Sequence, residues 1–196
     1  MRQVLRFGFM VLLLTAICSV LSAAKKKEKI PPNPRFTAIQ NISVLPVVDA
    51  RAGKKAGVNL GKLQGSVVRV LKKKRYFVGA ASTSGEAGEI AIEDIESADP
   101  KYIRKLGPPS ERWVMVVFLD DVASKITFGS TGNAELQGYL FDKDSGDLIW
   151  KAKGVGQAGQ GGLVGMTMKG MMKGAALDAA VSSLLASVPN LPKPGK

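Results

Sequence analysis

An unbroken apolar run over residues 113–119 stands out in the middle of the chain and ends at Asp120 and Asp121. A run of this length without a polar interruption predicts a strand that is buried on both faces, at the centre of a sheet. Because adjacent residues of a strand point to opposite faces, Asp120 and Asp121 are not expected to share one proton or one water molecule. The run therefore predicts the middle of the fold and no catalytic carboxylate pair.

The residues after this run predict two more strands. A break is expected at 129–132, and residues 134–141 then alternate between apolar and polar side chains, as in a strand with one buried face. The polar residues 142–147 predict a hairpin turn, which leads into a third strand at 148–150.

The residues before the run predict a β-α-β unit with a right-handed crossover. Residues 39–48 form its first strand, 58–74 an amphipathic helix and 76–81 its second strand. Four cations at 72–75 come at the end of this helix, where the helix dipole favours positive charge. We interpret them as helix-stabilising rather than as a dedicated anion site.

Two further helices follow from local signals. Asp99 and Pro100 form a helix start, as cap and first helical residue, and this short helix is expected to stop at Gly107. A C-terminal helix presents one apolar face, made of Leu177, Val181, Leu184 and Val188. The order β-α-β-α-β-β-β-α predicts a single two-layer α/β domain of the α+β type, a mixed sheet of about five strands with helices packed on one face.

Composition narrows the chemistry that this domain can perform. The chain has 196 residues, no His and a single Cys, Cys18. Without His it lacks the usual general base and the commonest metal ligand, and no Ser stands in a nucleophile motif. We therefore expect no enzyme, no catalytic residues and no cofactor.

The first 24 residues have the three parts of a secretory signal: a positive end, an apolar core and a small-residue cleavage site. Cleavage is expected after Ala24, and it places the protein in the periplasm or at the outer-membrane periphery. Lipidation of Cys18 is the alternative, although the bulky Ile17 before it fits the processing peptidase poorly. An uncleaved membrane anchor is the third possibility.

The remaining boundaries follow from composition and charge. Residues 25–36 form a basic, Pro-rich linker, 37–189 the α/β domain and 190–196 a disordered tail. The signal contains two Arg and no acidic residue, so the net charge falls from +12 to +10 on its removal, and this excess favours contact with an anionic membrane surface or cell wall. Nucleic acid is not expected as a partner, because the Lys clusters lack interleaved aromatic residues.

Two short motifs resemble ligand sites. Residues 154–159 match the dinucleotide fingerprint G-x-G-x-x-G, but no strand remains after the following helix, so we interpret them as a flexible loop. Asp142, Asp144 and Gly146 resemble the start of a calcium loop, yet apolar residues arrive before the bidentate Glu that such a loop needs. A hairpin turn explains these three residues better.

The segment 154–174 is rich in Gly and Met. Thioethers select Cu(I), but packing or partner contact is the preferred interpretation of the Met cluster, because no His or Cys assists it. The cluster consists of Met166, Met168, Met171 and Met172. The residues expected to contact a partner are Gly161, Gly162, Leu163, Met166, Met171 and Met172.

Four short sequence segments, residues 42–47, 76–78, 146–150 and 161–165, are spread over most of the chain beyond the signal. They resemble a family of small Gram-negative envelope proteins predicted to be lipoproteins. This family shares the α/β domain of the penicillin-binding-protein activator lipoproteins and of the curli-secretion lipoprotein. The resemblance implies an accessory or scaffold protein that docks on envelope machinery, with no catalytic residues to carry over. The context of Cys18 departs from that of a lipoprotein.

We therefore expect a non-catalytic exported protein that binds a protein partner of cell-envelope assembly or secretion machinery. The binding surface is one sheet edge or the Gly/Met-rich segment, and a second copy of the chain is a further candidate partner. The alternative is a periplasmic protein that binds a small ligand or Cu(I) through the Met cluster. An enzyme comes third, because it would need a deep pocket with converging carboxylates.

Overall fold

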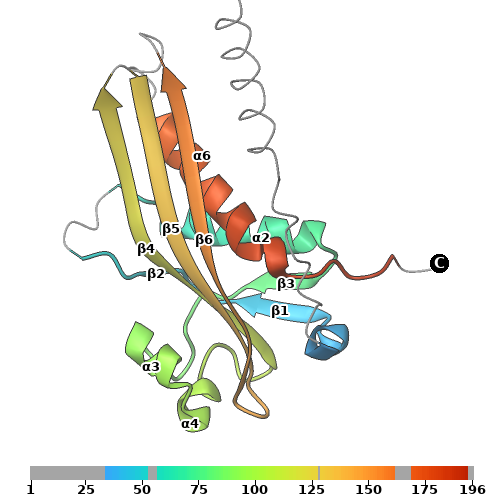
Figure 1. The fold of residues 1–196 in the computed structure, drawn as a ribbon. Helices are drawn as coiled ribbons and strands as arrows, with labels where there is room; N and C mark the ends of the chain where they lie inside the picture. Colours follow the sequence, from blue (N-terminus) through green and yellow to red (C-terminus); the bar gives the residue numbers. More distant parts are fainter. Residues whose placement is uncertain (1–33, 53–56, 128, 162–168, 194–196) are drawn as a thin grey trace, which may run out of the picture. The chain divides into compact units, whose positions relative to one another are not determined.

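The computed structural model describes residues 34–52, 57–127, 129–161 and 169–193, which form a mixed sheet with helices packed on it (Figure 1). The helices are α2 (Leu60–Lys73), α3 (Ile92–Ser97), α4 (Pro100–Ile103) and α6 (Lys169–Leu184), with 3-10 turns η1 (Pro34–Ala38) and η2 (Leu185–Ser187). The strands are β1 (Asn41–Val44), β2 (Val48–Asp49), β3 (Phe77–Ala80), β4 (Trp113–Thr127), β5 (Gly129–Asp142) and β6 (Asp147–Gly161). The predicted α/β fold class is confirmed.

The sheet has six strands in the order β3-β1-β4-β5-β6, and β2 pairs with β4. Strands β1, β3 and β4 pair in parallel, whereas β4, β5 and β6 are antiparallel. The predicted strand 39–48 is interrupted between β1 and β2, because Pro46 has no N–H to donate to the ladder. β4 lies in the middle as predicted, and β3 and β6 are the two edges.

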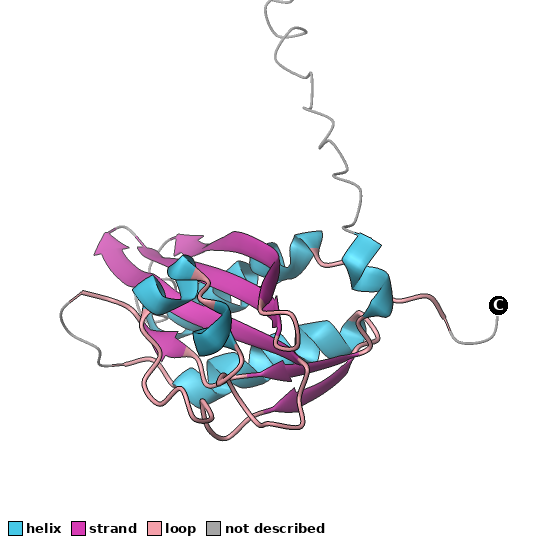
Figure 2. Ribbon diagram, turned by 90° about the horizontal axis from the view of Figure 1, so that it is seen from below, coloured by secondary structure: helices cyan, strands magenta, loops and turns pink. Residues whose placement is uncertain are grey.

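The central run of β4 supplies two apolar layers. Every residue from Val114 to Leu119 is fully buried. Alternate side chains point to α2 and α6 on one face and to α3 and α4 on the other, so helices lie on both sides of the strands (Figure 2). The sequence pattern had predicted helices on one face of the sheet only. On the second face, Ile95 of α3 and Ile103 of α4 cover the other half of the apolar run.

Helix α2 forms as its sequence pattern predicts. Asn59 caps its N-terminus, because the side-chain Oδ1 accepts the backbone N–H of Lys62 at 2.8 Å. Leu63, Val67 and Leu71 recur at a spacing of one helical turn and are buried against the sheet. This pattern places the C-terminal end of α2 beside the start of β3.

Strands β4, β5 and β6 are much longer than the apolar pattern predicted. Residues 129–132, the expected break, belong to β5, and residues 154–159, the expected flexible loop, belong to β6. Both predictions are wrong. These residues carry no apolar alternation, but ladder pairing needs only their backbone N–H and C=O groups.

Asp120 and Asp121 lie at a bulge inside β4 rather than at its end. The register shifts between Leu119 and Asp121, so that Asp121 pairs with Glu135. The Asp120 carboxylate accepts the side-chain amide N–H of Gln137 at 2.8 Å. Since Glu135 and Gln137 share one face of β5, the bulge brings both Asp residues to that face, contrary to the expected alternation.

Helix α6 lies directly on the glycines of β6. A Cβ on Gly156 would collide with the backbone of Ala176 and Ala180, and a Cβ on Gly154 would also collide with Ala180. The missing side chains let the helix backbone approach the sheet closely. This packing explains two of the three glycines of the 154–159 motif, Gly154 and Gly156, without a bound nucleotide.

Candidate functional site

Strand β3 is a four-residue strand at the edge of the sheet, and among the described residues no strand pairs with its outer side. The backbone N–H groups of Phe77 and Ala81 donate at 2.9 Å to carbonyls of β1 and of the residue before it. Because these groups alternate in direction along a strand, the N–H and C=O groups of Val78 and Ala80 point away from β1. This edge can therefore accept a further strand.

Phe77 is 72% exposed, more than any other large apolar side chain in the described ranges. Its neighbour Tyr76 is buried in the core beneath α2. A phenyl ring that stays in water forgoes about 2 kcal/mol of burial free energy, which a partner surface can supply. Phe77 is thus an apolar anchor next to the open backbone groups.

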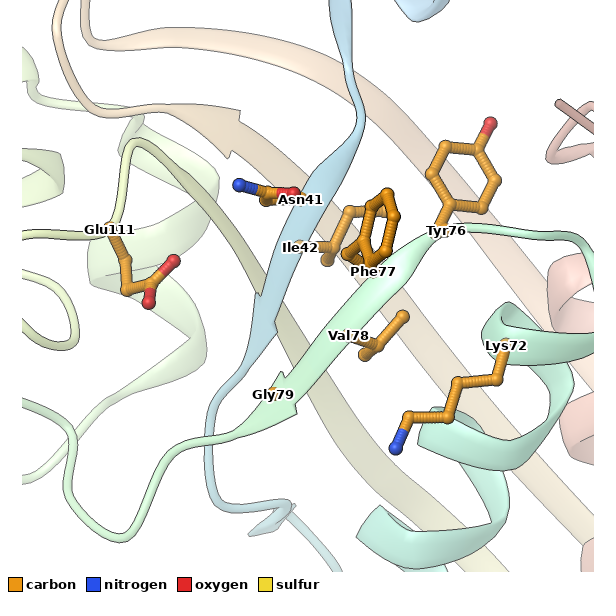
Figure 3. A pocket seen from close by; sticks show the side chains of 8 residues that line it. All are labelled: Asn41, Ile42, Lys72, Tyr76, Phe77, Val78, Gly79 and Glu111. Carbon is orange, nitrogen blue, oxygen red and sulfur yellow. The ribbon is translucent and has the colours of Figure 1, made fainter. Parts of the chain in front are cut away.

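A groove of about 640 Å³ lies at this end of the sheet and is lined by residues of both β3 and β1. It is lined by Asn41, Ile42, Lys72, Tyr76, Phe77, Val78, Gly79 and Glu111. Figure 3 shows Lys72 and Glu111 on opposite sides of the two strands, so the groove has a positive and a negative flank. We call this surface the β3-edge groove. It combines apolar side chains, open backbone groups and a charge on each side.

The end of α2 is tied to the segment that follows α6. The Tyr76 hydroxyl donates to the Pro189 carbonyl at 3.1 Å, and the Lys74 ammonium donates to the Val188 carbonyl at 2.6 Å. Burial raises the pKa of Tyr76 to about 12 and lowers the pKa of Lys74. The Leu191 N–H donates to the Lys74 carbonyl at 2.9 Å. These bonds fix the position at which β3 begins.

A polar cluster lies on the opposite face of the sheet, beneath α3. The Tyr139 hydroxyl is 3.0 Å from both the Glu96 carboxylate and the Gln137 carbonyl oxygen, and Lys151 donates to Glu96 at 2.9 Å. The Lys151 hydrogen bond lowers the pKa of Glu96, whereas burial raises the pKa of Tyr139 and that of Asp120. These hydrogen bonds link α3 to the sheet.

The hairpin between β5 and β6 uses the residues that resemble a calcium loop. The Asp142 carboxylate accepts two hydrogen bonds from Arg112, at 3.0 and 2.7 Å, which lower the pKa of Asp142. It also accepts the backbone N–H of Asp144 at 3.1 Å, and Gly146 supplies the positive φ of +79°. The predicted hairpin turn is confirmed. In the described ranges, no cluster of three or more acidic side chains is placed to hold a metal ion.

Most residues singled out in the Gly/Met segment and the signal fall outside the described ranges. They are Cys18, Ala24, Gly162, Leu163, Met166 and Met168. Gly161 ends β6, Met171 is 65% exposed and Met172 is half-buried. Partner contact and Cu(I) binding by this segment stay predictions. Of the helices that the structure describes, none combines the length and apolar character of a membrane span.

The sequence named a sheet edge as a binding surface without identifying the strand. The strand that became β3 was predicted, but its place at the edge depends on the pairing of β1 with β4. That pairing joins segments about seventy residues apart and leaves no local signal in the sequence. The exposure of Phe77 could have been suspected only from strand order.

No protein-family model matches the chain, and no curated protein matches it either. Solved structures that it is similar to include PelC from Paraburkholderia phytofirmans, at 10% identity and a TM-score of 0.48, over 79% of this chain and 90% of that one. Lipoprotein GNA1162 from Neisseria meningitidis shows 17% identity and a TM-score of 0.46, over 65% and 90%. The LpoB C-terminal domain from Escherichia coli shows 13% identity and a TM-score of 0.38, over 59% of this chain and 82% of that one.

Proposed function

We propose that this chain is a non-catalytic exported protein of the cell envelope, which acts as an accessory or scaffold by binding a protein partner. The partner adds an extended segment to the outer side of β3. The observation that carries this proposal is the exposed Phe77 beside the open backbone groups of Val78 and Ala80. An added strand would pair with those groups and cover the phenyl ring.

The β3-edge groove fits a peptide segment better than a small molecule. Small-molecule sites enclose their ligand and aim several polar groups at it. Here Lys72 and Glu111 lie on opposite sides of the strands, and the Tyr76 hydroxyl donates its hydrogen bond to the Pro189 carbonyl. An extended chain added along the outer side of β3 lies on the same side of the two strands as Lys72, so the Lys72 ammonium is the flanking charge within its reach.

The non-catalytic and exported parts of the proposal rest on the sequence. Without His, and with Cys18 inside the predicted signal, the folded domain has no conventional nucleophile and base pair. Residues 1–24 supply the expected export signal.

A photocrosslinking amino acid at position 77, introduced in living cells, tests the binding surface. We expect a discrete protein adduct that Ala80→Pro reduces at least about tenfold, because proline removes an outward N–H that a partner strand would use. Ala80→Ser keeps this N–H and is the matched control. Thermal unfolding of both variants confirms that they fold. Equal adduct yields from the Pro and Ser variants would contradict strand addition at β3.

A further inference from the structure

The outward face of α2 has an unusual composition. Its exposed positions are Gly61, Lys62, Gly65, Arg69, Lys72 and Lys73, and the helix contains no acidic residue. All six exposed positions of the helix are therefore glycines or cations, whereas Leu60, Gln64, Val68 and Val70 are half-buried. We call this surface the cationic face.

Helix-end electrostatics explain only part of this pattern. Lys72 and Lys73 lie in the last turn, where the helix dipole favours cations. Lys62 lies in the first turn, where the dipole disfavours a positive charge, and Arg69 lies outside the terminal turn. The helix dipole therefore does not explain the positions of Lys62 and Arg69.

Internal ion pairs do not explain the pattern either. Within the described ranges, no acidic side chain lies within salt-bridge distance of the four cations, Lys62, Arg69, Lys72 and Lys73. The acidic residue that α6 brings to α2 is Asp178, and its carboxylate accepts the Ser66 hydroxyl at 3.0 Å. The next two cations behave differently, because Lys74 and Arg75 donate to backbone carbonyls near the C-terminus. Among the residues that the structure describes, the four outward cations thus have no salt-bridge partner.

Gly65 is the second unexplained feature of this face. A Cβ at this position would meet nothing within 4 Å, so close packing inside the fold does not require glycine. Glycine inside a helix lowers helix stability relative to alanine. Gly61 and Gly65 have no side chain, so an external surface can approach the helix backbone between the cations.

We propose that the cationic face of α2 binds the surface of an anionic phospholipid bilayer. Lys62 and Lys73 are about 17 Å apart along the helix axis, and a planar anionic surface can contact all four cations at once. The apolar side of α2 is buried in the core, so the contact is electrostatic and at headgroup level. The face carries no aromatic side chain for base stacking, which disfavours nucleic acid.

Vesicle binding of the chain purified from its cells tests this proposal. The vesicles are phosphatidylcholine, with or without about one third phosphatidylglycerol. The variant reverses three charges, Lys62→Glu, Arg69→Glu and Lys73→Glu. A matched control reverses the exposed Lys101, Arg104 and Lys105 to Glu on the other side of the sheet. All proteins share the same N-terminal segment, so a difference between the two variants reports α2.

Each basic residue near a bilayer contributes about fivefold to the partition coefficient, so the α2 variant should bind at least about 100-fold more weakly. The control should stay within about tenfold of the wild type, and salt should weaken wild-type binding steeply. An equal loss in both variants would overturn the proposal, and so would equal wild-type binding to neutral vesicles.

A benzophenone probe gives an independent readout that anchoring through the N-terminus cannot mimic. Placed at Arg69, it should crosslink to phosphatidylglycerol several-fold more than the same probe placed at Lys101. Equal crosslinking from both positions would contradict the proposal. The α2 variant keeps the backbone of β3, so adduct formation from position 77 tests the proposed protein-binding edge separately.

Discussion

Helices α2 and α6 cover the same face of the sheet but reach it in different ways. Helix α2 is docked through large buried side chains, among them Leu63, Val67 and Leu71. The backbone of α6 lies against β6 above Gly154 and Gly156. A helix can thus be docked by adding apolar side chains to it or by removing side chains from the strand beneath it.

The two modes of docking should fail in opposite ways. The α2 interface loses stability when a side chain becomes smaller, because a cavity remains. The α6 interface loses stability when a side chain is added, because backbone atoms on both sides cannot move apart cheaply.

The largest effect is expected for Gly156→Ala. The new Cβ would collide with the backbone of Ala176 and Ala180, so the free energy of unfolding should fall by about 4 kcal/mol. The control is Gly161→Ala, at the open end of the same strand, which should change the free energy of unfolding by less than about 0.5 kcal/mol. Urea unfolding measures both. If Gly156→Ala lowered the free energy of unfolding only slightly, close backbone approach would not be what holds α6 on the sheet.

The next effect is expected for Leu71→Ala in α2. Leu71 is fully buried, and truncation should cost about 3 kcal/mol through lost burial and the cavity left behind. Lys73→Ala, on the exposed side of the same helix, should stay within about 0.5 kcal/mol. If Leu71→Ala were also neutral in urea unfolding, the contrast between the two helices would be lost.

Tyr76→Phe probes the link between the end of α2 and the segment after α6. Burial raises the pKa of Tyr76 to about 12, whereas an unfolded Tyr ionises near about 10. The unfolded state therefore releases its proton first, and stability should fall as the pH rises above about 10. By pH 11 this loss amounts to about 1 kcal/mol in the wild type and is absent in Tyr76→Phe. Parallel pH profiles of the two proteins would contradict this linkage.

The smallest expected effect is an increase in stability. Gly65→Ala adds a Cβ into open space on α2, so it should raise the free energy of unfolding by about 0.7 kcal/mol. The same substitution at Gly156 should be strongly destabilising. Thermal unfolding of the pair sharpens the distinction between a glycine required by packing and a glycine that internal packing does not need.

The sequence predicted α2 well because its apolar residues follow the helical period; only the structure shows that Asn59 caps it, so that it begins at Leu60 and not at Val58. It also predicted β4, whose apolar run is buried on both faces, and the short helix that Asp99 begins, since its carboxylate accepts the Lys101 N–H. In these elements a local pattern and the tertiary environment agree.

The sequence failed where backbone pairing or absent side chains determine the structure. Gly154 and Gly156 look like loop residues, yet β5 pairs with them and α6 packs on them. The alternation rule also failed at Asp120, because a bulge depends on the partner strand rather than on the bulged residues. The β3-edge groove was foreseen only as an unspecified sheet edge, since strand order is set by long-range pairing.

Single-residue hydrogen exchange of β3, with and without the crosslink-identified partner, tests strand addition most directly. In the chain alone, the amides of Val78 and Ala80 should exchange fast, because they point away from β1, whereas Gly79 should already be protected. In the complex, the Val78 and Ala80 amides should slow by at least about 100-fold, which only new backbone hydrogen bonds explain. Unchanged fast exchange at both positions in the complex would contradict a partner strand at this edge.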